Sequence, residues 1–204
     1  MAEMNQPQDA ETEIPLKDPF IAGVLAWLVP GLGHFYQGRT AKGVLYLVCI
    51  MGTFVYGLYL SGSEKVGWGR AVYMSFRSED VRLFWICQIG VGLPTVPMTL
   101  LQSNFVGQGK KPIWGGFMAP PEIETPDQAP FRDDPDPARK SLSELYRLLP
   151  IYFEMGTLYT TIAGLLNILA IYDACCGPVP AETGKKEEDE PDGNSTTGQA
   201  EDDK

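Results

Sequence analysis

The sequence holds one histidine, His34, in a short segment rich in glycine and aromatic residues. A histidine titrates near neutral pH, and together with Arg39 it could contact a lipid phosphate. Catalysis by histidine needs a positioned partner, and the sequence identifies none. Neither a GxSxG nucleophile motif nor an HExxH zinc motif occurs in the chain. We therefore expect no catalytic residue, and we interpret His34 as hydrogen-bonding to the backbone of its own turn.

The other reactive groups give no metal site and no cofactor site. The four cysteines form no CxxC pair and no cluster with the histidine, so neither a zinc site nor a disulfide framework is expected. Glu154 and Asp173 stand on either side of the last apolar run. Charged side chains at the end of a span can contact water at little cost in free energy. A role in coupling to ion movement is therefore the less favoured interpretation of these two residues.

The segment around His34 is typical of a turn between two membrane-spanning runs. From Pro19 to Gly38 the chain has 20 residues without a charge, and from Gly43 to Ser63 it has 21. Each run can cross a hydrocarbon core of ~30 Å as a helix. The intervening glycines allow tight turning, and the bases suit a short loop leaving a bilayer. The residues of this predicted hairpin motif are Pro30, Gly31, Gly33, His34, Tyr36, Gly38, Arg39 and Gly43.

Two further apolar runs follow. Residues 83–109 carry no charge, and we expect 83–103 to span with a kink at Gly90–Pro97, where glycine and proline interrupt the helix. Residues 155–172 are also uncharged. The predicted fold class is an all-α integral membrane protein with four transmembrane helices, a short interfacial helix and disordered acidic termini.

The same pattern predicts the boundaries of eight segments. Ser141 and Glu144 fit the S-x-x-E capping box, which indicates a helix start. The segments are a disordered acidic tail over 1–18, the transmembrane hairpin over 19–63, an interfacial or loop segment over 64–82, a kinked transmembrane helix over 83–103, a proline-rich loop over 104–137, an amphipathic interfacial helix over 138–150, a transmembrane helix over 151–175, and a second disordered acidic tail over 176–204.

The last run contains a seam of small residues. Gly156, Thr160 and Gly164 recur every four positions, and this small-xxx-small spacing lets a neighbouring helix pack closely. Asn167 lies on a neighbouring face, where its side chain can hydrogen-bond to another helix. We interpret these residues as helix-packing positions.

The distribution of charge bears on partners. The formal net charge is -10, and the two tails account for all of it. Since binding to phosphate backbones needs a basic face, nucleic acid is not expected as a partner. The lipid bilayer is expected as a partner. Other membrane proteins and a second copy of the chain are further candidates. In the four-span arrangement, the basic residues divide equally between the two sides of the membrane. Only the crowding of Arg39 and Lys42 into one short loop favours an orientation with both termini outside.

Residues 30–43 have the pattern P-G-x-G-x-x-Y-x-G-x-x-x-x-G between two apolar runs, and this pattern resembles the two-transmembrane-helix hairpin domain of the TM-two type. The resemblance covers about residues 17–62. Such hairpins usually close their second span with an Ile/Leu-Asp signature, and here a similar phrase, Leu169 to Asp173, stands at the end of the fourth run instead. The resemblance implies an uncharacterised protein of the bacterial cytoplasmic membrane, and no agreed activity.

These observations favour a multi-pass membrane protein that is not an enzyme and acts as a structural or interaction module. The alternative is a small transporter or channel that uses the break in the third run, because discontinuous helices can form sites at the bilayer midplane.

Overall fold

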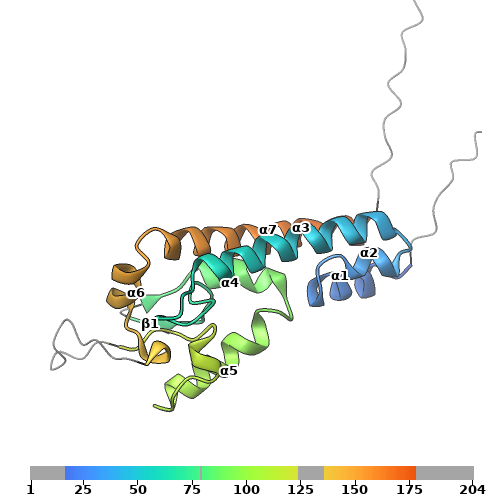
Figure 1. The fold of residues 1–204 in the computed structure, drawn as a ribbon. Helices are drawn as coiled ribbons and strands as arrows, with labels where there is room; N and C mark the ends of the chain where they lie inside the picture. The colour runs from blue at the N-terminus through green and yellow to red at the C-terminus, as the bar shows by residue number, and fades with distance from the viewer. Residues whose placement is uncertain (1–16, 79, 124–135, 178–204) are drawn as a thin grey trace, which may run out of the picture.

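A pair of long antiparallel helices forms the axis of the molecule (Figure 1). The computed structural model describes residues 17–78, 80–123 and 136–177, so the predicted acidic tails lie almost wholly outside the described residues. The helices of this described part are α1 (Pro19–Leu28), α2 (Leu32–Tyr36), α3 (Thr40–Leu60), α4 (Phe84–Gln88), η1 (Ile89–Val91), α5 (Val96–Gly107), η2 (Trp114–Gly116), η3 (Pro137–Arg139), α6 (Leu142–Leu148) and α7 (Tyr152–Cys176). The strands β1 (Phe76–Arg77) and β2 (Asp80–Val81) pair antiparallel.

The axis consists of α3 and α7, which pack closely because small residues face each other. A Cβ added at Gly57 would lie 2.7 Å from the Thr160 side chain and 3.0 Å from the Gly156 carbonyl oxygen. We call the end where α3 begins and α7 finishes the Asp173 end. The opposite end, where α3 finishes and α7 begins beside α6, is the α6 end.

A first short hairpin, α1 and α2, enters and leaves at the Asp173 end. Asp18 caps α1, its carboxylate accepting from the Phe20 backbone N–H at 2.9 Å. The ten residues of α1 extend only about 15 Å along α7 at 1.5 Å per residue. Gly31, at φ +85°, then reverses the chain, and a side chain there would overlap the Gly43 carbonyl oxygen. Helix α2 therefore returns beside α1 to the end from which it came.

A second hairpin, α4–η1 and α5, enters from the α6 end. Its first arm follows α7, since Arg82 Nη2 donates to Thr157 Oγ1 at 2.6 Å and Gln88 Nε2 donates to Thr160 Oγ1 at 2.8 Å. Gly92, at φ +78°, reverses the chain before α5. The two arms are antiparallel neighbours, because Trp85 Nε1 donates to Thr99 Oγ1 at 3.1 Å.

The tips of the two hairpins meet beside the middle of α7, at a contact that we call the junction. The Leu93 backbone N–H donates to the Leu28 carbonyl at 3.1 Å, and Trp27 Nε1 donates to the Ile89 carbonyl at 3.1 Å. Asn167 Nδ2 donates to one carbonyl of each hairpin, Ala26 at 3.1 Å and Gly90 at 2.8 Å. This arrangement agrees with the expected role of Asn167 in hydrogen-bonding between helices.

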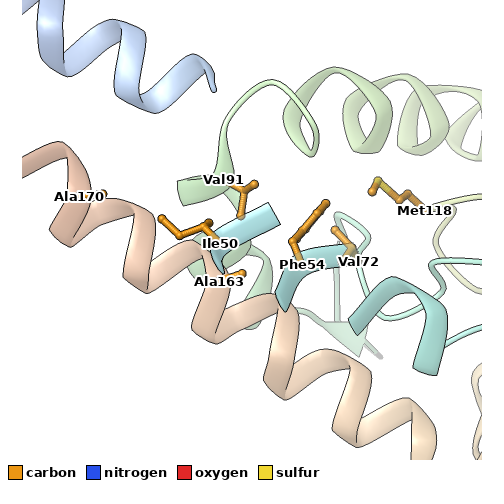
Figure 2. Packing of buried hydrophobic residues seen from close by; sticks show 7 residues of the cluster. All are labelled: Ile50, Phe54, Val72, Val91, Met118, Ala163 and Ala170. Atoms are coloured by element: carbon orange, nitrogen blue, oxygen red, sulfur yellow. The ribbon is translucent and has the colours of Figure 1, made fainter. Parts of the chain in front are cut away.

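The main apolar core lies where α3, α7 and η1 face one another. Figure 2 shows Ile50 and Phe54 of α3 grouped with Val91, with Val72 and with Ala163 of α7. All members of this cluster are at most 2% exposed. The predicted capping box of α6 is present, because the Ser141 backbone N–H donates to Glu144 Oε2 at 3.0 Å and the Glu144 N–H donates to Ser141 Oγ at 3.3 Å.

The expected four transmembrane helices are not confirmed. Among the described residues, two helices, α3 and α7, are long and apolar enough to cross a membrane. The first predicted span is divided, because α1 has only 10 residues and the chain then turns back. The third is divided at Gly92 into α4–η1 and α5. Four straight spans would place Arg39 and Asp173 on opposite sides, whereas their side chains are 2.9 Å apart.

Candidate functional site

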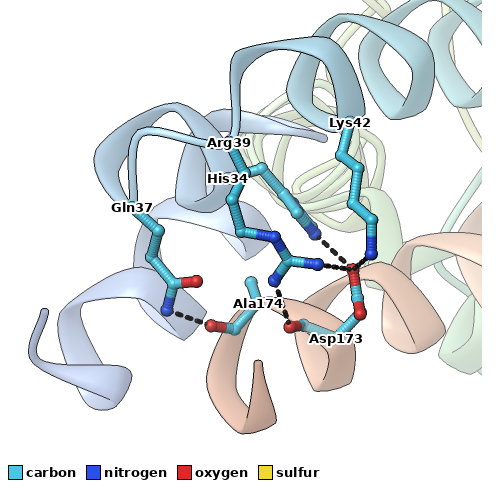
Figure 3. Close-up of polar contacts among 6 residues, drawn as sticks. All are labelled: His34, Gln37, Arg39, Lys42, Asp173 and Ala174. Atoms are coloured by element: carbon cyan, nitrogen blue, oxygen red, sulfur yellow. Dashed lines mark hydrogen bonds and ion pairs between the residues drawn. The ribbon is translucent and has the colours of Figure 1, made fainter. Parts of the chain in front are cut away.

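A single carboxylate gathers three basic side chains at the Asp173 end. Asp173 Oδ2 lies 2.9 Å from His34 Nε2, 2.9 Å from Arg39 Nη2 and 3.4 Å from Lys42 Nζ. Figure 3 shows these three bases converging on the carboxylate from the hairpin motif and the start of α3. We call this group of residues the Asp173 cluster.

The hairpin motif also binds the carbonyl groups at the end of α7. Arg39 Nη1 donates to the Asp173 carbonyl at 3.1 Å, and Gln37 Nε2 donates to the Ala174 carbonyl. The last carbonyls of a helix have no partner within the helix, and positive charge is favourable beside them. The motif therefore serves as the C-terminal cap of α7, a helix more than 130 residues away in sequence.

Local backbone geometry brings the three bases together. His34 lies on the single turn of α2, whose start is set by the positive φ of Gly31. Gly38, at φ +78°, ends that turn and directs the chain into α3, which places Arg39 at the N-cap and Lys42 in the first turn. The Tyr46 ring, 4.7 Å from the His34 ring between centroids, packs against the imidazole.

Burial differs within the cluster and decides what each contact contributes. His34 is fully buried and Arg39 is 13% exposed, whereas Lys42 is 47% exposed and contributes the least. Arg39 and Lys42 place positive charge beside the carboxylate. Within the described residues, His34 Nδ1 has no hydrogen-bond partner, and no nucleophilic side chain is bonded to the ring. The arrangement suits a charged structural tie between the hairpin and α7.

The structure assigns individual roles to the hairpin motif. Pro30 is buried, and Gly33 lies so close to α1 that a side chain would overlap the Ala22 carbonyl. Tyr36 packs against the alanine cluster of α1 and α7, with Lys17 Nζ 5.1 Å from its ring centroid. Gly43 faces the Phe35 ring at 3.0 Å from where a Cβ would stand. The expected hydrogen bond from His34 to the backbone of its own turn is wrong, because Nε2 contacts Asp173 and Nδ1 has no partner among the described residues. The sequence singled out His34, Arg39 and Asp173 separately and did not predict their contact.

The small-residue seam of α7 contacts two different elements. Gly156 and Thr160 face α3, and a Cβ at Gly156 would lie 2.6 Å from Ser61 Cβ. Gly164 instead faces α4, where a side chain would overlap the Cys87 carbonyl oxygen. The seam thus holds both the antiparallel partner and the second hairpin against one helix.

Two buried guanidinium groups lie toward the α6 end, and sequence reasoning did not single them out. Arg70 is fully buried, and its Nη1 donates to the Gly116 carbonyl at 2.9 Å. Burial lowers the pKa of Arg70 to about 10, so it remains protonated at neutral pH. Arg82 lies against the rings of Tyr73 and Phe153, at 4.8 and 5.1 Å from their centroids. Arg70 joins the polar segment 64–82 to the chain at Gly116 and Lys140, and Arg82 joins it to α7 through Thr157.

Metal binding has no support in the part of the chain that the structure describes, because no group of three or more His, Cys, Asp or Glu side chains there could hold an ion. No curated protein and no solved structure matches the chain. A family model does match, over residues 21–187, and it is not the two-transmembrane-helix hairpin family that residues 30–43 suggested. The matched region contains both hairpins, the junction and the Asp173 cluster, and on this match the chain belongs to DUF6677, a family of unknown function.

Proposed function

We propose that this chain is a multi-pass integral membrane protein that acts as a structural or interaction module, with α3 and α7 crossing the bilayer. The bilayer is its first partner, and other membrane proteins or a second copy are further ones; nucleic acid is not. The bacterial cytoplasmic membrane is the location that the hairpin motif favours.

The observation that carries the proposal is the exposure of α3 and α7. Only 22% of the most apolar window of α3 is buried, and 39% of that of α7. The core helix of a water-soluble protein would be mostly buried, and soluble proteins rarely expose so large an apolar surface. The large apolar side chains that are at least 40% exposed on these helices are Val44, Leu45, Val48, Val55, Tyr56, Tyr59, Tyr152, Leu158, Leu165, Leu166, Ile168, Leu169 and Tyr172.

Charges on the two helices agree with this placement. Between Gly43 and Leu60, and between Met155 and Tyr172, neither helix carries a charged residue. The charged groups stand at the ends, where Asp173 pairs with Arg39 and Lys42, and where Glu154 is exposed. End positions of this kind lie in the headgroup layer at little cost.

The two short hairpins are then re-entrant, which means that each enters and leaves on one face of the membrane. Half-length helices of about 15 Å reach only the middle of a ~30 Å hydrocarbon core. At that depth every backbone group needs a protein partner, and the junction supplies several through Asn167, Trp27 and the bond between Leu93 and Leu28.

Labelling of single cysteines tests both membrane residence and topology. Membranes containing the full chain are washed with carbonate and then treated with an impermeant thiol reagent from each side. Four proteins each retain one cysteine: native Cys176, Thr40→Cys, Ser78→Cys and Gln108→Cys. We expect Thr40→Cys and Cys176 to react from one face, and Ser78→Cys and Gln108→Cys from the other.

Four straight spans make a different prediction, because they pair Thr40→Cys with Gln108→Cys and Ser78→Cys with Cys176. Release of the protein by carbonate or high salt, without detergent, would refute membrane integration altogether. Ser78→Cys lies opposite Thr40→Cys in both arrangements, so it serves as the internal control for sidedness.

A small transporter or channel is the second candidate, and the break at Gly92 beside the buried Asn167 favours it. Against it, the junction is tightly closed, because a side chain at Gly92 would overlap the Trp27 carbonyl oxygen. Solute or ion flux through reconstituted protein would favour this alternative. We propose no enzymatic activity, since the Asp173 cluster neutralises charge and offers His34 no nucleophile.

A further inference from the structure

A cavity of about 440 Å³ lies near the α6 end, away from the Asp173 cluster. Four separate segments line it: β1, the end of α5 with the loop that follows it, residues 120–123, and the turn η3. They contribute four basic side chains, Arg77, Lys110, Lys111 and Arg139, and one carboxylate, Glu122. The chain as a whole has a net charge of -10, so a local excess of positive charge is opposite in sign to the rest of the molecule.

Two of the four bases are neutralised by neighbours. Arg139 Nη2 lies 2.8 Å from Glu122 Oε1, and Lys111 Nζ lies 3.3 Å from Asp136 Oδ2. The other two contact uncharged groups only, within the described residues. Arg77 Nη1 donates to the Pro121 carbonyl at 3.3 Å, and Lys110 Nζ lies 5.7 Å from the centroid of the Phe105 ring. The cavity can therefore accept an anion that brings one or two negative charges.

The position of the cavity indicates a ligand at the membrane surface. Helix α5 starts just after the junction and runs 12 residues, about 18 Å, so Lys110 follows at about half a bilayer from the midplane. Two of its leucines, Leu100 and Leu101, are at least 42% exposed, as expected of a lipid-facing helix. Trp114, shortly beyond, is 75% exposed, which is typical of tryptophan in the headgroup layer.

We propose that this cavity binds the phosphate headgroup of an anionic phospholipid, with Arg77 and Lys110 as its charge-bearing contacts. Guanidinium and ammonium groups bind phosphate oxygens through charge-assisted hydrogen bonds. Valine, proline and isoleucine complete the wall, through Val106, Pro112 and Ile123, and supply apolar surface for the glycerol and upper acyl region. This inference rests on the proposed membrane residence and adds a lipid class to it.

Native mass spectrometry of the full chain in neutral detergent tests the proposal. Phosphatidylglycerol and phosphatidylcholine are titrated separately, and the dissociation constant of the first bound lipid is measured. We expect phosphatidylglycerol to bind more tightly, and Lys110→Gln or Arg77→Gln to weaken it about five-fold each, the change that one base near an anionic surface confers. Lys110→Arg should retain binding.

The matched control is Lys65→Gln, which removes the same charge from an exposed position outside the cavity. An equal loss in this variant, or no preference for phosphatidylglycerol over phosphatidylcholine, would overturn the proposal. Binding of inorganic phosphate or glycerol phosphate as tightly as the lipid would overturn the lipid assignment and leave a site for soluble phosphate. Carbonate extraction tests membrane residence independently of lipid binding. If the protein stays in the membrane but does not prefer phosphatidylglycerol, the lipid site is refuted and the proposed membrane residence is not.

Discussion

At the scale of single residues, the molecule depends on one carboxylate that several bases share. Asp173 stands at the end of α7, and its contacts reach α2, the N-cap of α3 and the first turn of α3. Removing one partner of a buried ion pair lowers stability, because the remaining charge is still shielded from water and no longer has an opposite charge beside it. Here the loss would fall on the fully buried His34 and on Arg39 together.

Asp173→Asn should therefore destabilise the protein although the side chain keeps its shape. We expect a loss of about 1–3 kcal/mol, the range for a buried polar group left without its partner. Thermal unfolding of the detergent-solubilised protein measures it. Glu64→Gln neutralises an exposed acid in the loop after α3 and should change stability by less than about 0.5 kcal/mol. Equal melting of Asp173→Asn and wild type would show that the cluster is not a structural tie.

The members of this cluster illustrate what a sequence can and cannot predict. Local spacing identified His34, Arg39 and Gly43 as members of the hairpin motif. Residues 169–173 were identified because they resemble the Ile/Leu-Asp signature that usually ends the second span. Nothing local indicated that His34 and Asp173, 139 positions apart, are in contact. Spacing reports on neighbours along one helix, whereas a pairing between helices depends on how the whole chain folds back.

At the scale of elements, length decided where prediction succeeded. The apolar run after Lys42 became α3 and the one before Asp173 became α7, because each continues as an uninterrupted helix. Residues 19–38 have the same apolar length, yet α1 stops at Leu28. Counting uncharged residues cannot distinguish a span from two half-helices, since the reversal depends on close packing at Gly31, and at Gly92 in the second hairpin.

A pair of glycine substitutions compares a crowded backbone position with an open one. Gly92 and Gly38 both have φ +78°, but a Cβ at Gly92 would overlap the Trp27 carbonyl oxygen, whereas nothing lies within 4 Å at Gly38. Gly38→Ala should cost about 1 kcal/mol through the unfavourable φ alone. Gly92→Ala should cost about 1–3 kcal/mol more, or prevent folding, because the hairpin tips must separate. Chemical unfolding of both variants measures the difference, and similar losses in the two would contradict a tight junction.

At the scale of the whole molecule, two hairpins from opposite ends meet beside one helix, and Asn167 binds both of them. This places the interruption of the third run against the tip of the first hairpin, so each hairpin tip has a protein partner. It also places both ends of the described fold, Lys17 and Gly177, near the Asp173 end (Figure 1). The junction is the contact on which this arrangement depends.

A disulfide across the junction tests it directly. The Leu93 N–H bonds to the Leu28 carbonyl at 3.1 Å, so the two residues are close enough for a disulfide between substituted cysteines. In a chain whose native cysteines are replaced, Leu28→Cys with Leu93→Cys should cross-link within one molecule when membranes are treated with a membrane-permeant oxidant. Peptide mapping identifies the bond. Leu28→Cys with Leu101→Cys is the control, because Leu101 lies about 12 Å further along the second hairpin. Equal cross-linking of both pairs would indicate loose helices without a fixed junction, and cross-linking of neither would indicate that the hairpin tips do not meet.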